Sequence, residues 1–261
     1  MLDLKFKTYG DAGRPTIVLL HGLFGAATNW GSVARTLSGD YHVIVPDLRN
    51  HGQSPHVPEH SYPAMAADVM ALLDSCGLTQ TILVGHSMGG KVAMYLALNH
   101  PERVERLAVV DISPVQYRHN FDAVFATFRA VDLARLQSRA DADRQMAKGG
   151  LGDGVRAFLL QNLVKGPDAW HWRLNLDALE QSQATITGFP EHAGARYAGV
   201  TWFIHGALSD YVQPDYEEAI RRYFPNAVMC PVAGAGHWVY ADQPLGFADC
   251  LQAFLTDSRQ G

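Results

Sequence analysis

The sequence predicts an α/β fold in which a mostly parallel central sheet has helices on both faces and carries an inserted helical cap. Short apolar runs of strand length alternate with segments whose apolar residues recur at helical spacing, an order typical of parallel sheets. From about residue 114 to 196 no apolar strand appears and helical spacing continues. This segment is long for a crossover. We therefore expect a core domain of residues 1–113 and 197–261 and a cap of residues 114–196.

The core elements are expected in a regular order along the chain. Leu2–Tyr9 alternates apolar and polar residues, which is typical of a half-exposed edge strand. Runs that are almost wholly apolar predict central strands; they are residues 15–20, 41–45, 81–84, 104–110, 200–204 and 227–232. Helical spacing predicts helices at residues 26–37, 62–76, 91–99, 215–223 and 244–256.

The bulk properties argue against several classes of protein. The 261 residues carry a net charge of −5 without a long basic run, which disfavours a nucleic-acid partner. The three cysteines, Cys76, Cys230 and Cys250, are widely spaced and form no C-x-x-C pair, so we expect reduced, mostly buried thiols. No apolar run reaches signal-peptide or membrane-span length, so we expect a cytoplasmic protein without a membrane span. No cluster of side chains at metal-ligand spacing is visible, and we expect neither a metal nor an organic cofactor.

The stretch Thr81–Gly90, TILVGHSMGG, predicts the nucleophile. A buried-strand pattern runs into a serine, Ser87, with Gly85 and Gly89 two residues away on either side, and a helix pattern follows. This is the strand-turn-helix setting that a G-x-S-x-G elbow requires. A serine that only caps the helix is the simpler alternative. We expect Ser87 to attack substrate from the N-terminus of a helix, where developing negative charge is favoured.

A base and an acid are expected in loops that follow later strands. His237 lies in a glycine-lined loop after the last strand, in the chain order Ser, acid, His. Two aspartates compete for the acid, Asp111 after the strand that follows the elbow unit and Asp210 in the loop after the next strand. Ser209 lies three residues after Gly206 and Asp210 four. If Ser209 points inward, Asp111 supplies the carboxylate and Ser209 a supporting hydrogen bond; we favour Asp111.

Two backbone N–H groups are the candidate oxyanion hole. They belong to Leu23, in the glycine-bracketed loop after the strand at residues 15–20, and to Met88, directly after the nucleophile. The neighbouring aromatic residues Phe24 and Trp238 are candidate substrate-binding residues, and an aromatic-rich cap predicts an apolar binding cavity. Asp47 is left out of the catalytic set, because a structural ion pair with Arg49 is expected to hold its loop.

Five stretches together resemble a known family: HGLFG, PDLRNHGQSP, GHSMGGKVAM, VVDISPV and GAGHWVYADQP, spread from residue 21 to 244. They resemble the α/β-hydrolase fold, and more closely its YbfF-type esterase branch, which is related to abhydrolase-domain-containing protein 11. The resemblance implies an esterase of acyl esters or thioesters that uses Ser87, His237 and the Leu23 and Met88 N–H groups. It also implicates Asp111 together with Ser209. The branch usually has Gly-Asn-Ser where this chain has Ala207-Leu208-Ser209, which keeps Asp210 open as the acid.

The function expected from the sequence is therefore a serine esterase. It would hydrolyse short- to medium-chain acyl esters or thioesters through an acyl-enzyme. A carbon–carbon bond hydrolase with the same triad is one alternative. A non-catalytic small-ligand sensor on a hydrolase scaffold is the other. The expected partner is a small-molecule ester; the oligomeric state is left open.

Overall fold

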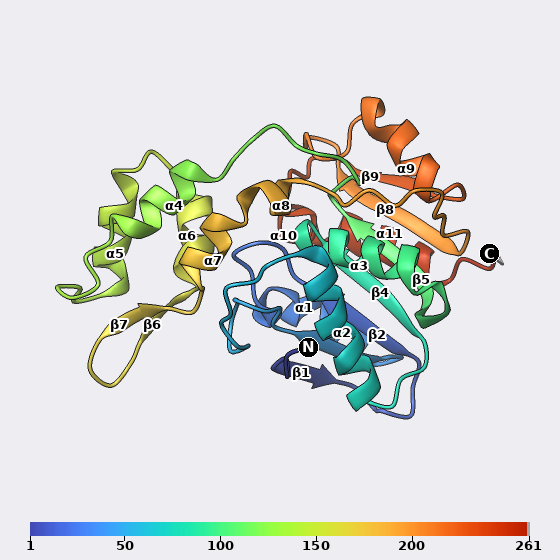
Figure 1. The fold of residues 1–261 in the computed structure, drawn as a ribbon, viewed down its shortest axis with the longest axis horizontal. Helices are drawn as coiled ribbons and strands as arrows, with labels where there is room; N and C mark the ends of the chain where they lie inside the picture. Colours follow the sequence, from blue (N-terminus) through green and yellow to red (C-terminus); the bar gives the residue numbers. More distant parts are fainter. Residues whose placement is uncertain (260–261) are drawn as a thin grey trace.

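The computed structural model describes residues 1–259 and has a seven-stranded sheet as its centre (Figure 1). The strand order is β1-β3-β2-β4-β5-β8-β9, and every neighbouring pair is parallel except β1 with β3. The strands are β1 Phe6–Tyr9, β2 Thr16–Leu20, β3 His42–Pro46, β4 Thr81–His86, β5 Val104–Val110, β8 Val200–Gly206 and β9 Val228–Val232. The predicted α/β fold with a mostly parallel sheet is confirmed.

Helices cover both faces of the sheet, because the central strands are apolar on both sides. In β4, for example, Leu83 packs into one core and Ile82 with Val84 into the other. The first core also contains residues of α2 Tyr62–Ser75, α3 Met88–Asn99 and α9 Glu217–Tyr223, the last preceded by η3 Pro214–Tyr216. The second is covered by η1 Ala27–Trp30, α1 Gly31–Leu37, α10 Val239–Asp242 and α11 Pro244–Leu255. None of the helices in the described part of the chain combines the length and hydropathy that a membrane crossing requires.

Strand β1 is shorter than predicted. It begins at Phe6, four residues after the expected start at Leu2. The backbone N–H of Leu2 donates to Asp68 and that of Lys5 to the Ser54 hydroxyl, so these two N–H groups bond to side chains and not to β3. The alternation of apolar and polar residues does not reveal whether a backbone N–H bonds to a side-chain oxygen or to the carbonyl of a neighbouring strand.

The segment between β5 and β8, which we call the cap, lies largely beside the sheet (Figure 1). Its helices are α4 Asp122–Arg129, α5 Arg139–Ala147, α6 Asp153–Leu160, α7 Leu176–Gln181 and α8 Gln183–Thr187. It also holds a two-stranded antiparallel sheet of β6 Leu163–Lys165 and β7 Trp170–Trp172. The expectation that the cap lacks strands is wrong, because three-residue strands with mixed polarity leave no apolar run to detect. The boundaries at residues 114 and 196 stay a prediction.

A buried lysine ties both ends of the cap to the core. The Lys91 ammonium, on α3, donates hydrogen bonds to the carbonyls of Val115, Thr187 and Gly188 at 3.1, 2.8 and 2.5 Å. Val115 lies where the chain leaves the core and the other two where it returns. Burial lowers the pKa of Lys91 to about 7. All three ammonium protons have acceptors, which offsets the cost of burying the charge.

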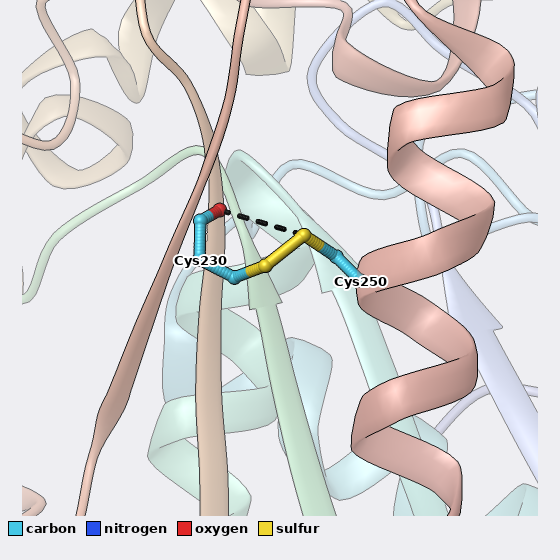
Figure 2. The surroundings of a disulfide bond; sticks show 2 residues. All are labelled: Cys230 and Cys250. Carbon is cyan, nitrogen blue, oxygen red and sulfur yellow. Dashed lines mark hydrogen bonds between the residues drawn. A yellow bond between two sulfur atoms is a disulfide. The ribbon is translucent and has the colours of Figure 1, made fainter.

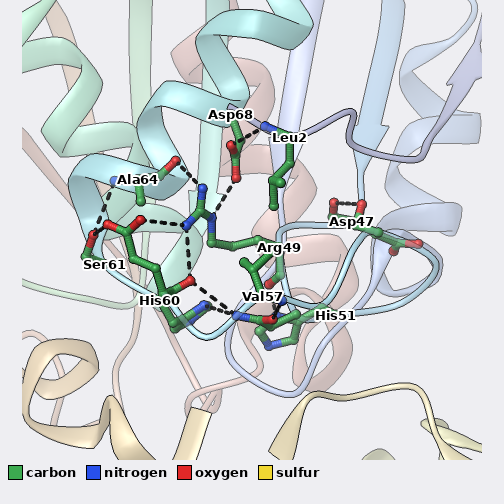
Figure 3. Close-up of polar contacts among 12 residues, drawn as sticks. Leu2, Asp47, Arg49, His51, Val57, His60, Ser61, Ala64 and Asp68 are labelled. Atoms are coloured by element: carbon green, nitrogen blue, oxygen red, sulfur yellow. Dashed lines mark hydrogen bonds and ion pairs between the residues drawn. The ribbon is translucent and has the colours of Figure 1, made fainter. Parts of the chain in front are cut away.

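The predicted ion pair between Asp47 and Arg49 is wrong (Figure 3). Arg49 Nε lies 2.6 Å from Asp68 Oδ2 of α2, a carboxylate without solvent exposure. Asp47 instead accepts the backbone N–H groups of Ala27 and Gln53 at 2.7 and 2.9 Å. Both aspartates thus hold the loop after β3. The wrong pairing assumed that neighbours in sequence are neighbours in space, whereas the buried Asp68 carboxylate requires a cation from another element.

Four histidines are buried as neutral imidazoles. They are His21, His51, His60 and His86. Burial lowers the pKa of each, to about 3 for His60. Because a buried cation without a partner is costly, protonation of these rings opposes the folded state.

A disulfide joins Cys230 of β9 to Cys250 of α11 (Figure 2). The expectation of three reduced cysteines is therefore wrong for this pair, whereas Cys76 is free. The two residues are 20 positions apart in the chain, yet packing of α11 against β9 brings their Cα atoms to 6.3 Å. Sequence spacing does not reveal such a packing contact.

Acidification below about pH 6.5 is expected to lower the free energy of unfolding. Unfolded histidines titrate near pH 6.5, while the buried ones have lowered pKa values, so the unfolded state binds more protons below that pH. The contribution is fully present above pH 6.5 and declines by up to about 1.4 kcal/mol per pH unit for each histidine. Urea unfolding at pH 7.5, 6.5 and 5.5 measures it; equal stability at the three values would contradict the interpretation.

Two matched variants test whether the pH dependence of stability comes from the buried histidines. His60→Gln should lower the slope of the unfolding free energy against pH by the contribution of one buried histidine, because its ring is removed. His171→Gln removes an exposed histidine and should leave the dependence unchanged.

A thiol count tests the disulfide. Protein purified without reductant and unfolded in guanidinium should react with a chromogenic thiol reagent at one cysteine, Cys76, and at three after reduction. The Cys76→Ala variant should give none before reduction. Three reactive thiols in the unreduced wild type would show that the bond does not form.

Candidate active site

The nucleophile elbow brings backbone segments close together around Ser87. Ser87 has φ +52 and links β4 to α3. A Cβ on Gly85 would lie 2.3 Å from the Gly89 carbonyl oxygen, and one on Gly89 would lie 2.5 Å from that of Leu20. Since real Cβ atoms do not approach so closely, both positions require glycine. The strand, turn and helix expected around the G-x-S-x-G sequence are therefore present.

A chain of hydrogen bonds runs from the serine to a buried carboxylate. His237 Nε2 lies 3.1 Å from Ser87 Oγ, and His237 Nδ1 lies 2.7 Å from Asp111 Oδ2. Because a carboxylate only accepts, we assign the proton to Nδ1, which leaves Nε2 able to accept from the hydroxyl. This is the geometry of a nucleophile, a base and an orienting acid.

Asp111, and not Asp210, faces His237. The Asp111 side chain is fully buried and also accepts hydrogen bonds from the Gly206 N–H at 3.0 Å and the Ser209 hydroxyl at 2.5 Å. Asp210 is exposed and accepts from the Gln213 amide. Ser209 therefore has the inward position, which is the case in which Asp111 is expected to supply the carboxylate.

Two side chains that the sequence analysis did not select hold the His237 loop. The Tyr211 ring stacks on the His237 ring, with centroids 4.0 Å apart and planes at 25°. His86 Nε2 donates to the His237 carbonyl at 2.9 Å, so His86 points toward the base loop. Burial raises the pKa of Tyr211 to about 12 and lowers that of His86. Tyr211 lies in the loop after β8 and His86 at the end of β4, so both contacts join residues from different strand ends, and no local pattern indicates them.

The two candidate oxyanion donors lie on either side of the elbow. Within residues 1–259 the Leu23 N–H donates no hydrogen bond. Met88 is the first residue of α3, where an N–H has no intrahelical acceptor. A Cβ on Gly22 would lie 3.2 Å from Ser87 Cβ, so the turn that carries Leu23 packs directly against the nucleophile. Both N–H groups are thus available beside Ser87.

The two candidate substrate-binding residues differ in their surroundings. Phe24 is buried under cap aromatics, with its ring 5.4 to 5.9 Å from those of Phe121, Phe125 and Phe128. Trp238 lies against Phe158 of α6 and lines a cavity of about 1080 Å³ among α1, α6, α10 and α11. The lining of this cavity does not include Ser87. Phe24, packed against the three cap phenylalanines, forms part of the wall between core and cap.

Metal chemistry has no candidate site in the part of the chain that the structure describes. There, no group of three or more His, Cys, Asp or Glu side chains is placed to hold a metal ion. Of the four buried histidines, His21, His51 and His86 bond to backbone groups. The His60 ring instead contacts the side chains of Asn50 and Met88.

Comparison with known proteins identifies the family. Residues 15–244 match the family model described as alpha/beta hydrolase fold. The mouse (Mus musculus) sn-1-specific diacylglycerol lipase ABHD11 is 46% identical over 94% of this chain and 82% of its own length. Esterase YbfF of Escherichia coli is 37% identical over 92% of this chain and 93% of its own.

A solved structure agrees as well. A marine microorganism esterase superposes with a TM-score of 0.93 at 31% identity and covers 97% of this chain and 99% of its own. The predicted resemblance is therefore confirmed: the chain belongs to the α/β-hydrolase family and is a relative of its esterases and lipases.

Proposed function

We propose that this protein is a serine esterase that hydrolyses short- to medium-chain acyl esters or thioesters through an acyl-enzyme intermediate. The observation that carries the proposal is the continuous hydrogen-bond chain from Ser87 Oγ through His237 to Asp111. The esterases and lipases among its relatives support the same class of reaction. Pure ligand binding does not need a nucleophile, a base and free N–H donors together, which disfavours a sensor.

In the first half-reaction Ser87 is acylated. Ser87 Oγ attacks the ester carbonyl carbon while its proton passes to His237 Nε2, and the Asp111 carboxylate stabilises the imidazolium. The oxyanion that forms accepts hydrogen bonds from the Leu23 and Met88 N–H groups. Collapse breaks the bond to the alcohol or thiol, which takes the proton from His237, and leaves the acyl group on Ser87.

In the second half-reaction water releases the acid. His237 Nε2 removes a proton from water, whose oxygen attacks the acyl carbon, and the same two N–H groups hold the second oxyanion. Ser87 Oγ then leaves with the proton from His237. Ser209 donates to the same Asp111 oxygen as His237 and so helps to keep the carboxylate in place.

The apolar surroundings support an apolar acyl group. Phenylalanines of the cap pack over Phe24 beside the elbow, and Trp238 follows the base directly. An apolar wall with a few polar groups is typical of a pocket for a small apolar substrate.

Substitution of the acid candidates tests the triad. Ser87→Ala should abolish ester hydrolysis, and Asp111→Asn should lower kcat by about 10³- to 10⁴-fold, since an amide cannot orient and stabilise the imidazolium as a carboxylate does. Asp210→Asn, the matched control, should stay within about 2-fold, because it lies outside the hydrogen-bond chain. Steady-state kinetics on a p-nitrophenyl ester measures all three; near-normal activity of Asp111→Asn would contradict the assignment.

Acyl-chain preference is a separate prediction. With p-nitrophenyl esters from acetyl to palmitoyl, turnover should peak at short or medium chains. A peak at the longest chains, or turnover restricted to a diacylglycerol, would favour the activity named for the mouse relative. A folded protein without turnover on any ester would favour a carbon–carbon bond hydrolase or a sensor.

A further inference from the structure

Phe24, the residue after the candidate oxyanion donor Leu23, has an unfavourable backbone conformation. Its φ is +60, in the left-handed region that favours glycine. The Gly25 N–H donates to the Gly22 carbonyl at 3.0 Å, which closes a four-residue turn, and Leu23 is not among the residues with positive φ. This combination defines a type II turn, whose third position normally holds glycine. Other contacts must therefore hold Phe24.

One contact comes from the core. The Phe24 N–H donates to His51 Nε2 at 3.2 Å, and His51 Nδ1 lies 2.9 Å from the Arg49 carbonyl. A carbonyl only accepts and a backbone N–H only donates, so the proton is on Nδ1 and the ring is neutral. His51 is fully buried, and burial lowers its pKa, which favours the same form.

The loop that carries His51 is itself held rigidly (Figure 3). Besides its ion pair with Asp68, the Arg49 guanidinium donates to the carbonyls of Glu59 and Ala64 at 3.0 and 3.1 Å. The acceptor for Phe24 is therefore fixed to α2 through Arg49.

The second contact comes from the cap. The Asn162 side-chain amide, between α6 and β6, donates to the Phe24 carbonyl at 2.8 Å and is buried. The N–H on one side of the Phe24 Cα is thus held by the core and the carbonyl on the other side by the cap. With both peptide planes held, φ and ψ of Phe24 are determined.

We propose that His51 and Asn162 are positioning residues for the oxyanion hole. Together they hold Phe24, and through it the Gly22–Gly25 turn, in the conformation that keeps the Leu23 N–H beside Ser87 and free to bind the oxyanion. Because Asn162 belongs to the cap, the position of the cap on the core affects how well the Leu23 N–H can stabilise the transition state. The inference rests on the proposed esterase function and adds to it the residues that orient the Leu23 donor.

Kinetics of three variants tests the inference on an ester that the wild type hydrolyses. His51→Leu removes the acceptor and should lower kcat by about 10- to 100-fold with KM changed by less than about 3-fold, since the oxyanion forms only in the transition state. Asn162→Ala should lower kcat about 10-fold. His51→Gln offers an amide oxygen to the Phe24 N–H and should restore part of the loss.

Two further measurements separate positioning from folding. First, rates are expressed per active site, counted by titration to completion with a fluorophosphonate. Second, the inhibition constant of a trifluoromethyl ketone is measured, because this inhibitor forms an oxyanion on Ser87. The constant should rise by the same factor as kcat/KM falls. His56→Gln is the matched control. His56 lies in the same loop and contacts the cap at the Arg173 carbonyl, but not Phe24, so its kcat should be unchanged.

Unchanged kcat per titrated site in His51→Leu and Asn162→Ala would overturn the inference while leaving the esterase intact. An equal loss in His56→Gln would also overturn it, because general loosening of the loop would then explain the effect. If His51→Leu does not fold, His51→Gln and Asn162→Ala decide the question by the same criteria. Absence of wild-type turnover on every ester would overturn the proposed function, and the inference with it.

Discussion

Close backbone packing at the elbow between β4 and α3 is the constraint on which the site depends. Side chains at Gly85 and Gly89 would collide with neighbouring carbonyls, so the turn can be this tight only with glycine, and Ser87 is forced to positive φ. Because β4 lies between β2 and β5 in a parallel arrangement, the loops after those strands emerge beside Ser87. The donor loop and the acid therefore reach the nucleophile from its two sides.

Backbone strain in the described residues is concentrated around this site. The non-glycine residues with positive φ are Phe24, Asn50, Ser87 and Asp111. Ser87 and Asp111 directly follow β4 and β5, whereas Phe24 and Asn50 lie in the loops after β2 and β3. Hydrogen bonds hold each of them: Asp111, for example, accepts from Gly206, Ser209 and His237. Such conformations persist only where the surroundings determine them fully. The rigidity of these loops and the placement of the reactive groups thus have the same physical origin.

Buried polar groups connect the core to the cap. Lys91 bonds to the chain where it enters and leaves the cap, and Asn162 reaches from the cap to Phe24. A buried donor without an acceptor costs about 1–3 kcal/mol, so these bonds favour one seating of the cap on the core. The helix that follows Ser87 and the turn that follows Gly22 are therefore both coupled to the cap.

The sequence by itself determined the sheet, most element positions, the elbow and the identity of Ser87 and His237 as candidates, because these follow from local periodicity and turn chemistry. Only the tertiary structure decided the contact of His237 with Asp111 and not Asp210, the pairing of Arg49 with Asp68 and the Cys230–Cys250 bond. The same holds for the contacts of Tyr211, His51 and Asn162. These contacts join residues from separate elements. Their formation depends on strand order and on the packing of the loops, which no local pattern encodes.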